Sequence, residues 1–335
     1  MNDARPSADL AGLEKELERG RADLARLREE IGATFLGHAD VVDQLLWALL
    51  AGGHVLLEGV PGLGKTTLVK ALAAALGMDF ARVQFTPDLM PGDILGLLVL
   101  EEDDAGRKSF RLQRGPVFTH VLLADEINRA TPRTQSALLE AMQEEQVTLH
   151  GATHRLPDPF LVVATQNPIE MEGTWPLPEA QLDRFLFKIE LASPEEDELV
   201  SVLAATASAS RAARPAALDA ARVLRLRQLA RGVPASSEIV RWTARLVRAT
   251  HPASSTAPEG VRRHVRHGAS PRGGQAVLWG AKARALCAGR LFVSREDLQA
   301  VARPALRHRL ILSYEGEAAG VDPDELVGRA LATLD

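Results

Sequence analysis

Eight residues, Gly59 to Thr66, constrain the fold of this chain more than any other segment. They read GVPGLGKT and satisfy every fixed position of the phosphate-binding loop pattern G-x-x-x-x-G-K-[ST]. Residues 54–58 before them predict a short buried strand, and residues 67–76 after them predict a helix that ends at Gly77. This order of strand, glycine loop and helix is the structural context that the phosphate-binding motif requires. A glycine-rich turn without a ligand is the less favoured alternative.

The residue types in this loop suit the binding of phosphate. The glycines permit a tight turn whose N–H groups point inwards, and the following helix adds partial positive charge. Lys65 supplies a full charge near the β- and γ-phosphates, and the Thr66 hydroxyl is the expected Mg²⁺ ligand. The predicted nucleotide-binding residues are Gly59, Pro61, Gly62, Leu63, Gly64, Lys65, Thr66 and Thr67.

Composition limits the remaining classes of protein. The 335 residues, of which 46% are hydrophobic, suffice for one large or two ordinary domains with a substantial core. The net charge of −5 gives no general preference for nucleic acid. The single cysteine, Cys287, excludes a disulfide within the chain and indicates an inert packing thiol. We expect a cytosolic protein without a membrane span, because no signal segment or membrane-length apolar run occurs.

Strands and helices alternate up to about residue 192, which indicates a parallel α/β sheet. Hairpins are expected at residues 97–112, with a turn at 103–106, and at 147–156, with a turn around Gly151. From Ser193 onwards only helical periodicity is evident, with loops predicted at 207–217 and 252–260. Besides the strand at 54–58, further strands are predicted at 81–85, 121–126, 160–165 and 185–189, of which the one at 121–126 is continuously apolar and the one at 160–165 is expected to be buried.

The sequence therefore predicts three segments: an N-terminal helix at 1–33, an α/β core with two hairpin inserts at 34–192, and a helical lid at 193–335. In the N-terminal helix apolar residues follow a 3-4 spacing, with Gly20 at one position of the stripe. We expect this helix to pack its stripe on the body, and a short coiled coil with a partner is the alternative. The stripe comprises Leu10, Leu13, Leu17, Leu24, Leu27 and Ile31.

Two acidic residues end the apolar strand that begins at residue 121. Ligands of parallel sheets bind at the carboxyl ends of the strands, so Asp125 and Glu126 should lie near the phosphates. Asp125 would hold Mg²⁺ through water, and Glu126 would polarise the attacking water as general base. Asn167, after the next apolar strand, would donate to the γ-phosphate and accept from that water. The alternatives are a solvated helix cap for the acidic pair and a turn residue for Asn167.

Four segments together resemble the MoxR family of AAA+ ATPases, and the match runs from about residue 33 to the end. The resemblance implies a P-loop AAA+ core with a parallel sheet, an all-helical lid, and Mg²⁺-dependent hydrolysis of ATP to ADP and phosphate. The segments are Gly59–Thr66, LLADEINRA at 122–130, ATQNP at 164–168 and LPEAQLDRF at 177–185, and GASPR at 268–272 also fits.

The resemblance adds two arginines to the catalytic set of Lys65, Asp125, Glu126 and Asn167. Arg184 matches the arginine finger, which reaches ATP bound to the neighbouring subunit. Arg272 matches sensor 2, which would reach from the lid of the same chain to the γ-phosphate, although the two glycines after it weaken the helix.

The two hairpins correspond to the helix-2 insert and the pre-sensor-1 insert. In relatives such as magnesium chelatase subunits and replicative helicases, these inserts line or approach a central pore. The alternative is that they are exposed connections without a special role.

The resemblance implies a ring, hexameric by expectation, that remodels or activates a protein client in a chaperone-like manner, with a von Willebrand factor A domain protein as partner. A nucleic-acid-stimulated motor is the alternative, because residues 241–310 hold about fourteen Lys/Arg against three Asp/Glu. Few aromatic residues and no zinc-finger spacing make nucleic acid the less favoured partner. A scaffold that binds nucleotide without hydrolysis is disfavoured by the complete catalytic set. The identity of the client is not encoded in any of these motifs.

Overall fold

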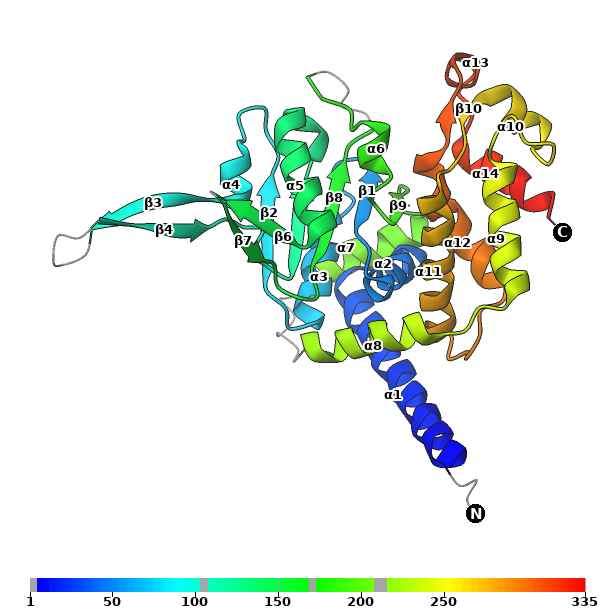
Figure 1. Cartoon of the computed structure of the whole chain (residues 1–335), viewed down its shortest axis with the longest axis horizontal. Coiled ribbons are helices and arrows are strands. Elements are labelled where there is room, and N and C mark those ends of the chain that lie inside the picture. The colour runs from blue at the N-terminus through cyan, green and yellow to red at the C-terminus, as the bar shows by residue number, and fades with distance from the viewer. Residues whose placement is uncertain (1–4, 103–107, 150, 169–172, 208–215, 335) are drawn as a thin grey trace.

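The structure is a computed structural model that describes residues 5–102, 108–149, 151–168, 173–207 and 216–334 (Figure 1). Its elements up to the end of the sheet are α1 (Arg5–Thr34), α2 (Ala39–Ala51), β1 (Val55–Gly59), α3 (Lys65–Ala75), β2 (Phe80–Gln84), α4 (Pro91–Leu95), β3 (Gly96–Glu102), β4 (Lys108–Arg114), β5 (Val121–Asp125), the 3₁₀ turn η1 (Ile127–Arg129), α5 (Pro132–Glu144), β6 (Gln146–Leu149), β7 (Ala152–Arg155), β8 (Leu161–Gln166), α6 (Glu179–Leu182) and β9 (Phe187–Leu191). The elements that follow are α7 (Glu196–Ala207), α8 (Ala220–Gly232), α9 (Ser237–Ala249), α10 (Glu259–His264), β10 (Val265–His267), α11 (Pro271–Cys287), α12 (Arg295–Leu306), η2 (Arg307–Arg309), β11 (Ile311–Leu312), α13 (Tyr314–Ala318) and α14 (Pro323–Ala332).

Five parallel strands form the central sheet in the order β2-β5-β8-β1-β9. All five predicted strands are present with small shifts in their bounds. β5 and β8 lie inside the sheet, and burial of both their faces explains their continuous apolar runs. Because the strands are parallel, the segments that follow β1, β5 and β8 all leave from the same edge, which we call the carboxyl edge.

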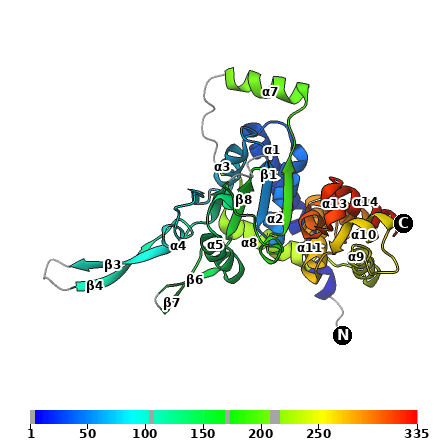
Figure 2. The same ribbon diagram turned by 90° about the horizontal axis from the view of Figure 1, so that it is seen from above.

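Both predicted hairpins are present: β3 pairs with β4, and β6 pairs with β7. The β3–β4 hairpin projects far from the body (Figures 1 and 2), and it exposes Leu97, Leu100 and Phe110. The predicted turn at 103–106 lies outside the described residues. In the second hairpin Gly151 has a φ of 84°, which suits its position at the turn.

The carboxyl half of α1 packs on the body, whereas its amino end points away from it (Figure 1). Leu24, Leu27 and Ile31 are buried, so the prediction of one packed apolar stripe is confirmed for this half. Close packing explains the glycine at position 20 of this apolar stripe, because a Cβ there would lie 3.0 Å from a methyl carbon of Leu226 in α8.

The segment after β9 is helical, as predicted, with one addition. β10 and β11 form a small antiparallel sheet in the lid, and strands of three and two residues are too short to show a period in the sequence. The predicted loop at 252–260 is confirmed up to Glu259, where α10 begins, whereas most of the one at 207–217 lies outside the described residues. Among the described residues no helix has the length and apolar character needed to span a membrane.

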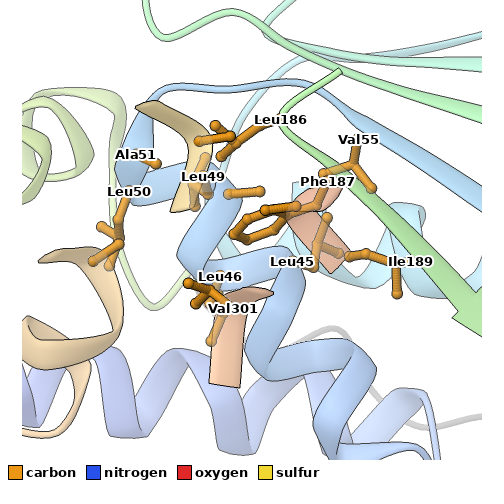
Figure 3. Packing of buried hydrophobic residues seen from close by; sticks show 14 of the residues in the cluster. Leu45, Leu46, Leu49, Leu50, Ala51, Val55, Leu186, Phe187, Ile189 and Val301 are labelled. Atoms are coloured by element: carbon orange, nitrogen blue, oxygen red, sulfur yellow. The ribbon is translucent and has the colours of Figure 1, made fainter. Parts of the chain in front are cut away.

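One apolar cluster joins the sheet to the lid (Figure 3). The ring of Phe187 in β9 lies beside Leu45 and Leu49 of α2, close to Val301 of α12. Gly280 of α11 faces the same ring, and a Cβ there would lie 2.5 Å from Phe187 Cζ. Only glycine therefore permits this approach of α11 to the sheet. Full burial of one such side chain contributes about 1.5–3 kcal/mol, so the position of α11 is strongly determined.

Candidate nucleotide-binding site

The predicted phosphate loop turns between the end of β1 and the start of α3. Gly62 and Gly64 have φ values of 88° and 79°, which side chains rarely adopt, so these two glycines are required by the turn. Lys65 is the first residue of α3, and its ammonium group donates to the Gly59 carbonyl oxygen and lies 3.5 Å from that of Gln166. Lys65 thus bridges the carboxyl ends of β1 and β8, at the edge where the predicted phosphate loop lies.

Asp125, the last residue of β5, is only 8% exposed and is hydrogen-bonded through both carboxylate oxygens. Thr165 Oγ1 donates to Oδ1 at 2.6 Å. Arg82 of β2 donates to Oδ2 through Nε at 3.0 Å and through Nη2 at 2.7 Å. The cation beside this carboxylate is therefore the Arg82 guanidinium, which the sequence did not predict.

Glu126 adopts a left-handed backbone conformation, with a φ of 56°. Such a conformation costs on the order of 1–3 kcal/mol for a residue with a side chain, and hydrogen bonds hold it here. Its N–H donates to Thr165 Oγ1 at 2.8 Å, and its Oε2 accepts from Gln84 at 2.9 Å and from Arg129 at 2.8 Å. Arg82 donates in turn to the Gln84 side-chain oxygen at 2.8 Å, so the two carboxylates share one chain of hydrogen bonds.

Asn167 follows β8 at the same edge and is only 5% exposed. The structure thus brings the loop, Lys65, the two acidic residues and Asn167 to one edge of the sheet. Sequence reasoning missed Arg82, Gln84 and Thr165. A signal for the first two existed, because residues two apart in a strand share a face.

Arg184 and Arg272 lie at the opposite, amino edge of the sheet. Both line a cavity of about 310 Å³, together with His54 and Leu186, which directly precede β1 and β9. The length of β1 separates this edge from the phosphate loop by roughly 13 Å, at about 3.3 Å per residue. The prediction that Arg272 reaches the phosphate of its own chain does not agree with this placement. The physical reason is the packing of α11 against β9, where Gly280 approaches Phe187, while Arg272 at the start of the helix lines the amino-edge cavity.

His54 anchors the amino edge as a neutral imidazole. Its Nδ1 accepts from the Val162 N–H at 3.0 Å, so its proton resides on Nε2, which donates to the Met142 carbonyl oxygen at 3.0 Å. Burial lowers the pKa of His54 from 6.5 to about 4. His54 therefore joins β8 to α5 only while it is uncharged.

This shift predicts a pH-dependent loss of stability on acidification. The unfolded chain takes up a proton below about pH 6.5 and folded His54 only near pH 4, so the free energy of unfolding falls between these values. We expect His54 to account for a loss of about 2 kcal/mol between roughly pH 7 and 5. Urea unfolding of the wild type and of His54→Gln across this range measures the difference. Parallel pH profiles for the two proteins would contradict the assignment.

Comparison with known proteins agrees with this geometry. Residues 54–187 match the family model "ATPase family associated with various cellular activities (AAA)", and residues 259–330 match the AAA lid domain. The chain is 42% identical over 314 residues to chaperone MoxR1 of Mycobacterium tuberculosis, covering 93% of this chain and 81% of that protein. It is 35% identical over 331 residues to protein MoxR of Paracoccus denitrificans, covering 92% and 96%.

The fold has a solved counterpart of nearly equal length. A crystal structure from Cytophaga hutchinsonii, provisionally assigned as an ATPase, matches with a TM-score of 0.90 at 37% identity and covers 98% of both chains. The sequence motifs, the five-stranded parallel sheet, the helical lid and the relatives that match over most of the chain all indicate the same family. The chain belongs to the MoxR family of chaperone-like AAA ATPases.

Proposed function

We propose that this protein hydrolyses ATP at the interfaces of a homo-oligomeric ring, expected to be a hexamer, and uses the cycle to remodel or activate a protein client. The main support is the separation of two half-sites within one chain. The loop with Asp125 and Glu126 lies at the carboxyl edge, and Arg184 and Arg272 lie at the amino edge. A triphosphate bound to the loop meets both sets only if a second copy supplies the arginines. Arg272 is accordingly reassigned to act on the neighbour's nucleotide.

The oxygen donors at the carboxyl edge fit a magnesium site. Thr66, in the first turn of α3, and Asp125 supply a hydroxyl and a carboxylate, and Mg²⁺ needs only one or two protein oxygens besides phosphate and water. When bound, the ion would neutralise negative charge on the phosphates. Lys65 would hold the β- and γ-phosphates, Glu126 would accept a proton from the attacking water, and Asn167 would orient that water.

Arg82 competes with any cation at Asp125, which gives a second testable expectation. Asp125 is nearly buried, but the Arg82 side chain is open to solvent, so we take the value of a surface ion pair, about 0.2–1 kcal/mol. Arg82→Ala should therefore lower the Mg²⁺ concentration for half-maximal binding of a fluorescent ATP analogue by up to about fivefold. Arg263→Ala removes an arginine from an exposed pair with Glu315 in the lid and serves as control. An unchanged or raised Mg²⁺ requirement in Arg82→Ala would contradict the competition.

The projecting β3–β4 hairpin supports a protein client. Leu100 and Phe110 pair across the two strands and expose apolar side chains on one face, the kind of surface that contacts other proteins, and Leu97 is exposed as well. A von Willebrand factor A domain protein as partner, and a cytosolic location, stay predictions from the sequence. The nucleic-acid alternative loses its main support, because many arginines of the basic segment pair with acidic side chains: Arg263 with Glu315, Arg266 with Glu179, Arg284 and Arg290 with Asp297, and Arg307 with Asp324.

A mixing experiment tests hydrolysis between subunits. Arg184→Ala keeps the loop and the carboxylates, whereas Glu126→Gln keeps the arginine side. Each variant alone should be nearly inactive, and a mixture should recover hydrolysis at interfaces that pair an intact Glu126 with an intact Arg184. Phosphate release is measured with each variant alone and after mixing. A mixture no more active than its components, although mixed oligomers are present by native mass spectrometry, would overturn the proposal.

A further inference from the structure

The amino edge contains a hydrogen-bonded connection between the core and the lid. Asp183 directly precedes Arg184 in the core, and Ser270 lies two residues before Arg272 in the lid. Ser270 Oγ lies 3.0 Å from both carboxylate oxygens of Asp183, to which its hydroxyl donates. The same Oγ accepts from the Arg272 backbone N–H at 3.1 Å and so caps α11. One hydroxyl thus connects the segments that carry the two arginines.

Arg309 holds the Arg184 segment from the lid side. Its side chain is 3% exposed, and its Nε donates to Asp183 Oδ1 at 2.8 Å. Its Nη2 donates to the carbonyl oxygens of Asp183 at 2.9 Å and of Phe185 at 2.7 Å, and Nη1 donates to that of Leu186 at 3.1 Å. These carbonyl groups flank Arg184 on both sides. A planar guanidinium with several fixed donors restrains a loop more tightly than a single bond would.

We propose that Asp183, Ser270 and Arg309, here named the finger clamp, are positioning residues that present Arg184 and Arg272 to the neighbouring subunit as one unit. The inference rests on the proposed function, in which both arginines act on the neighbour's nucleotide. Charge stabilisation in a transition state depends on donors that are already oriented, so a loosened clamp lowers turnover without removing either arginine. The clamp acts through Arg184 and Arg272 and does not itself touch the nucleotide.

Ser270→Ala is the variant of choice. It removes the connecting hydroxyl and leaves the ion pair of Asp183 and Arg309 intact, whereas removing the Asp183 carboxylate would leave the buried Arg309 guanidinium without its charged partner. Ser236→Ala is a matched control. Ser236 caps another lid helix, α9, where its Oγ accepts from the Ile239 N–H at 3.3 Å. Both variants lose a helix-capping serine of the lid, but only Ser270 connects to Asp183.

The test places Ser270→Ala in one or the other chain of the active mixture. In the Glu126→Gln chain, which supplies the working arginines, it should lower phosphate release about tenfold. In the Arg184→Ala chain, which supplies the working loop, the loss should be at most about twofold, because that chain already lacks the arginine that its clamp would position. Ser236→Ala should give no such asymmetry in either chain. Binding of a fluorescent ATP analogue to Ser270→Ala, and its thermal midpoint relative to Ser236→Ala, should be nearly unchanged.

The outcomes separate the clamp from a general structural role. Equal losses in both placements, or no loss in either, would overturn the finger clamp while the activity of the parent mixture still supports the proposed function. An inactive parent mixture would overturn the proposed function, and the clamp with it. Asp183→Asn, which retains the acceptor oxygen but not the charge, serves as second variant and should show the same asymmetry if it folds.

Discussion

Arg184→Ala is expected to lower kcat for ATP hydrolysis by roughly 10³-fold or more, the usual effect of removing an arginine finger. Affinity for ATP should change little, because Arg184 lies a strand length away from the loop of its own chain. Within the chain its Nη1 donates only to the Leu139 carbonyl oxygen among the bonds recorded for the described residues, at 2.8 Å. Loss of that one bond should leave the fold intact.

Steady-state phosphate release, measured together with ATP binding and thermal unfolding, checks this expectation. Arg295→Ala, which removes an exposed lid arginine paired with Glu238, controls for the loss of charge. Arg184→Lys keeps the positive charge but not the planar guanidinium with its fixed donors, so it should be only partly more active than Arg184→Ala. If Arg184→Ala hydrolysed ATP at the wild-type rate at any protein concentration, Arg184 would not be a finger.

Glu126→Gln should lower kcat by about 10²–10⁴-fold while ATP stays bound. The amide has the same shape, and its oxygen can still accept from Gln84 and Arg129, so the strained backbone conformation should persist. The amide cannot accept the proton of the attacking water, and it also lacks the negative charge that pairs with Arg129. The variant should therefore accumulate in the ATP-bound state.

Single-turnover hydrolysis and nucleotide analysis of the purified variant measure these two properties. Glu140→Gln makes the same chemical change on the exposed face of α5 and should behave as the wild type. Rapid hydrolysis by Glu126→Gln would exclude Glu126 as the base. Failure to bind ATP would instead indicate that its carboxylate shapes the site.

The sequence predicted the parts of the molecule that local spacing determines. Lys65, Asp125 and Glu126 converge because each lies at or just beyond the carboxyl end of an apolar strand in a parallel sheet, and both properties can be seen in the sequence. The pairing of Arg82 with Asp125 depends on β2 lying next to β5, and strand order is a tertiary property. β10 and β11 escaped prediction because they are too short to show a period.

The placement of Arg272 shows most clearly where local reasoning fails. Its position at a helix start was predicted correctly, but the direction of that helix depends on a contact between Gly280 and Phe187, which are distant in sequence. Helical periodicity predicted α11 as a helix, but nothing in that pattern indicated a role for Gly280. Only the fold shows that this glycine admits an aromatic ring.

The apolar cluster around Phe187 has a mechanical consequence. A jaw-like closure of the lid over its own nucleotide would pull α11 and α12 away from β9 and expose Phe187 and Val301 to water, at a cost of several kcal/mol by about 1.5–3 kcal/mol per side chain. Rotation of the sheet and the lid together as one rigid body avoids that cost. In the proposed ring, a displacement caused by ATP at one interface would therefore move the core and the lid as one body toward the next protomer.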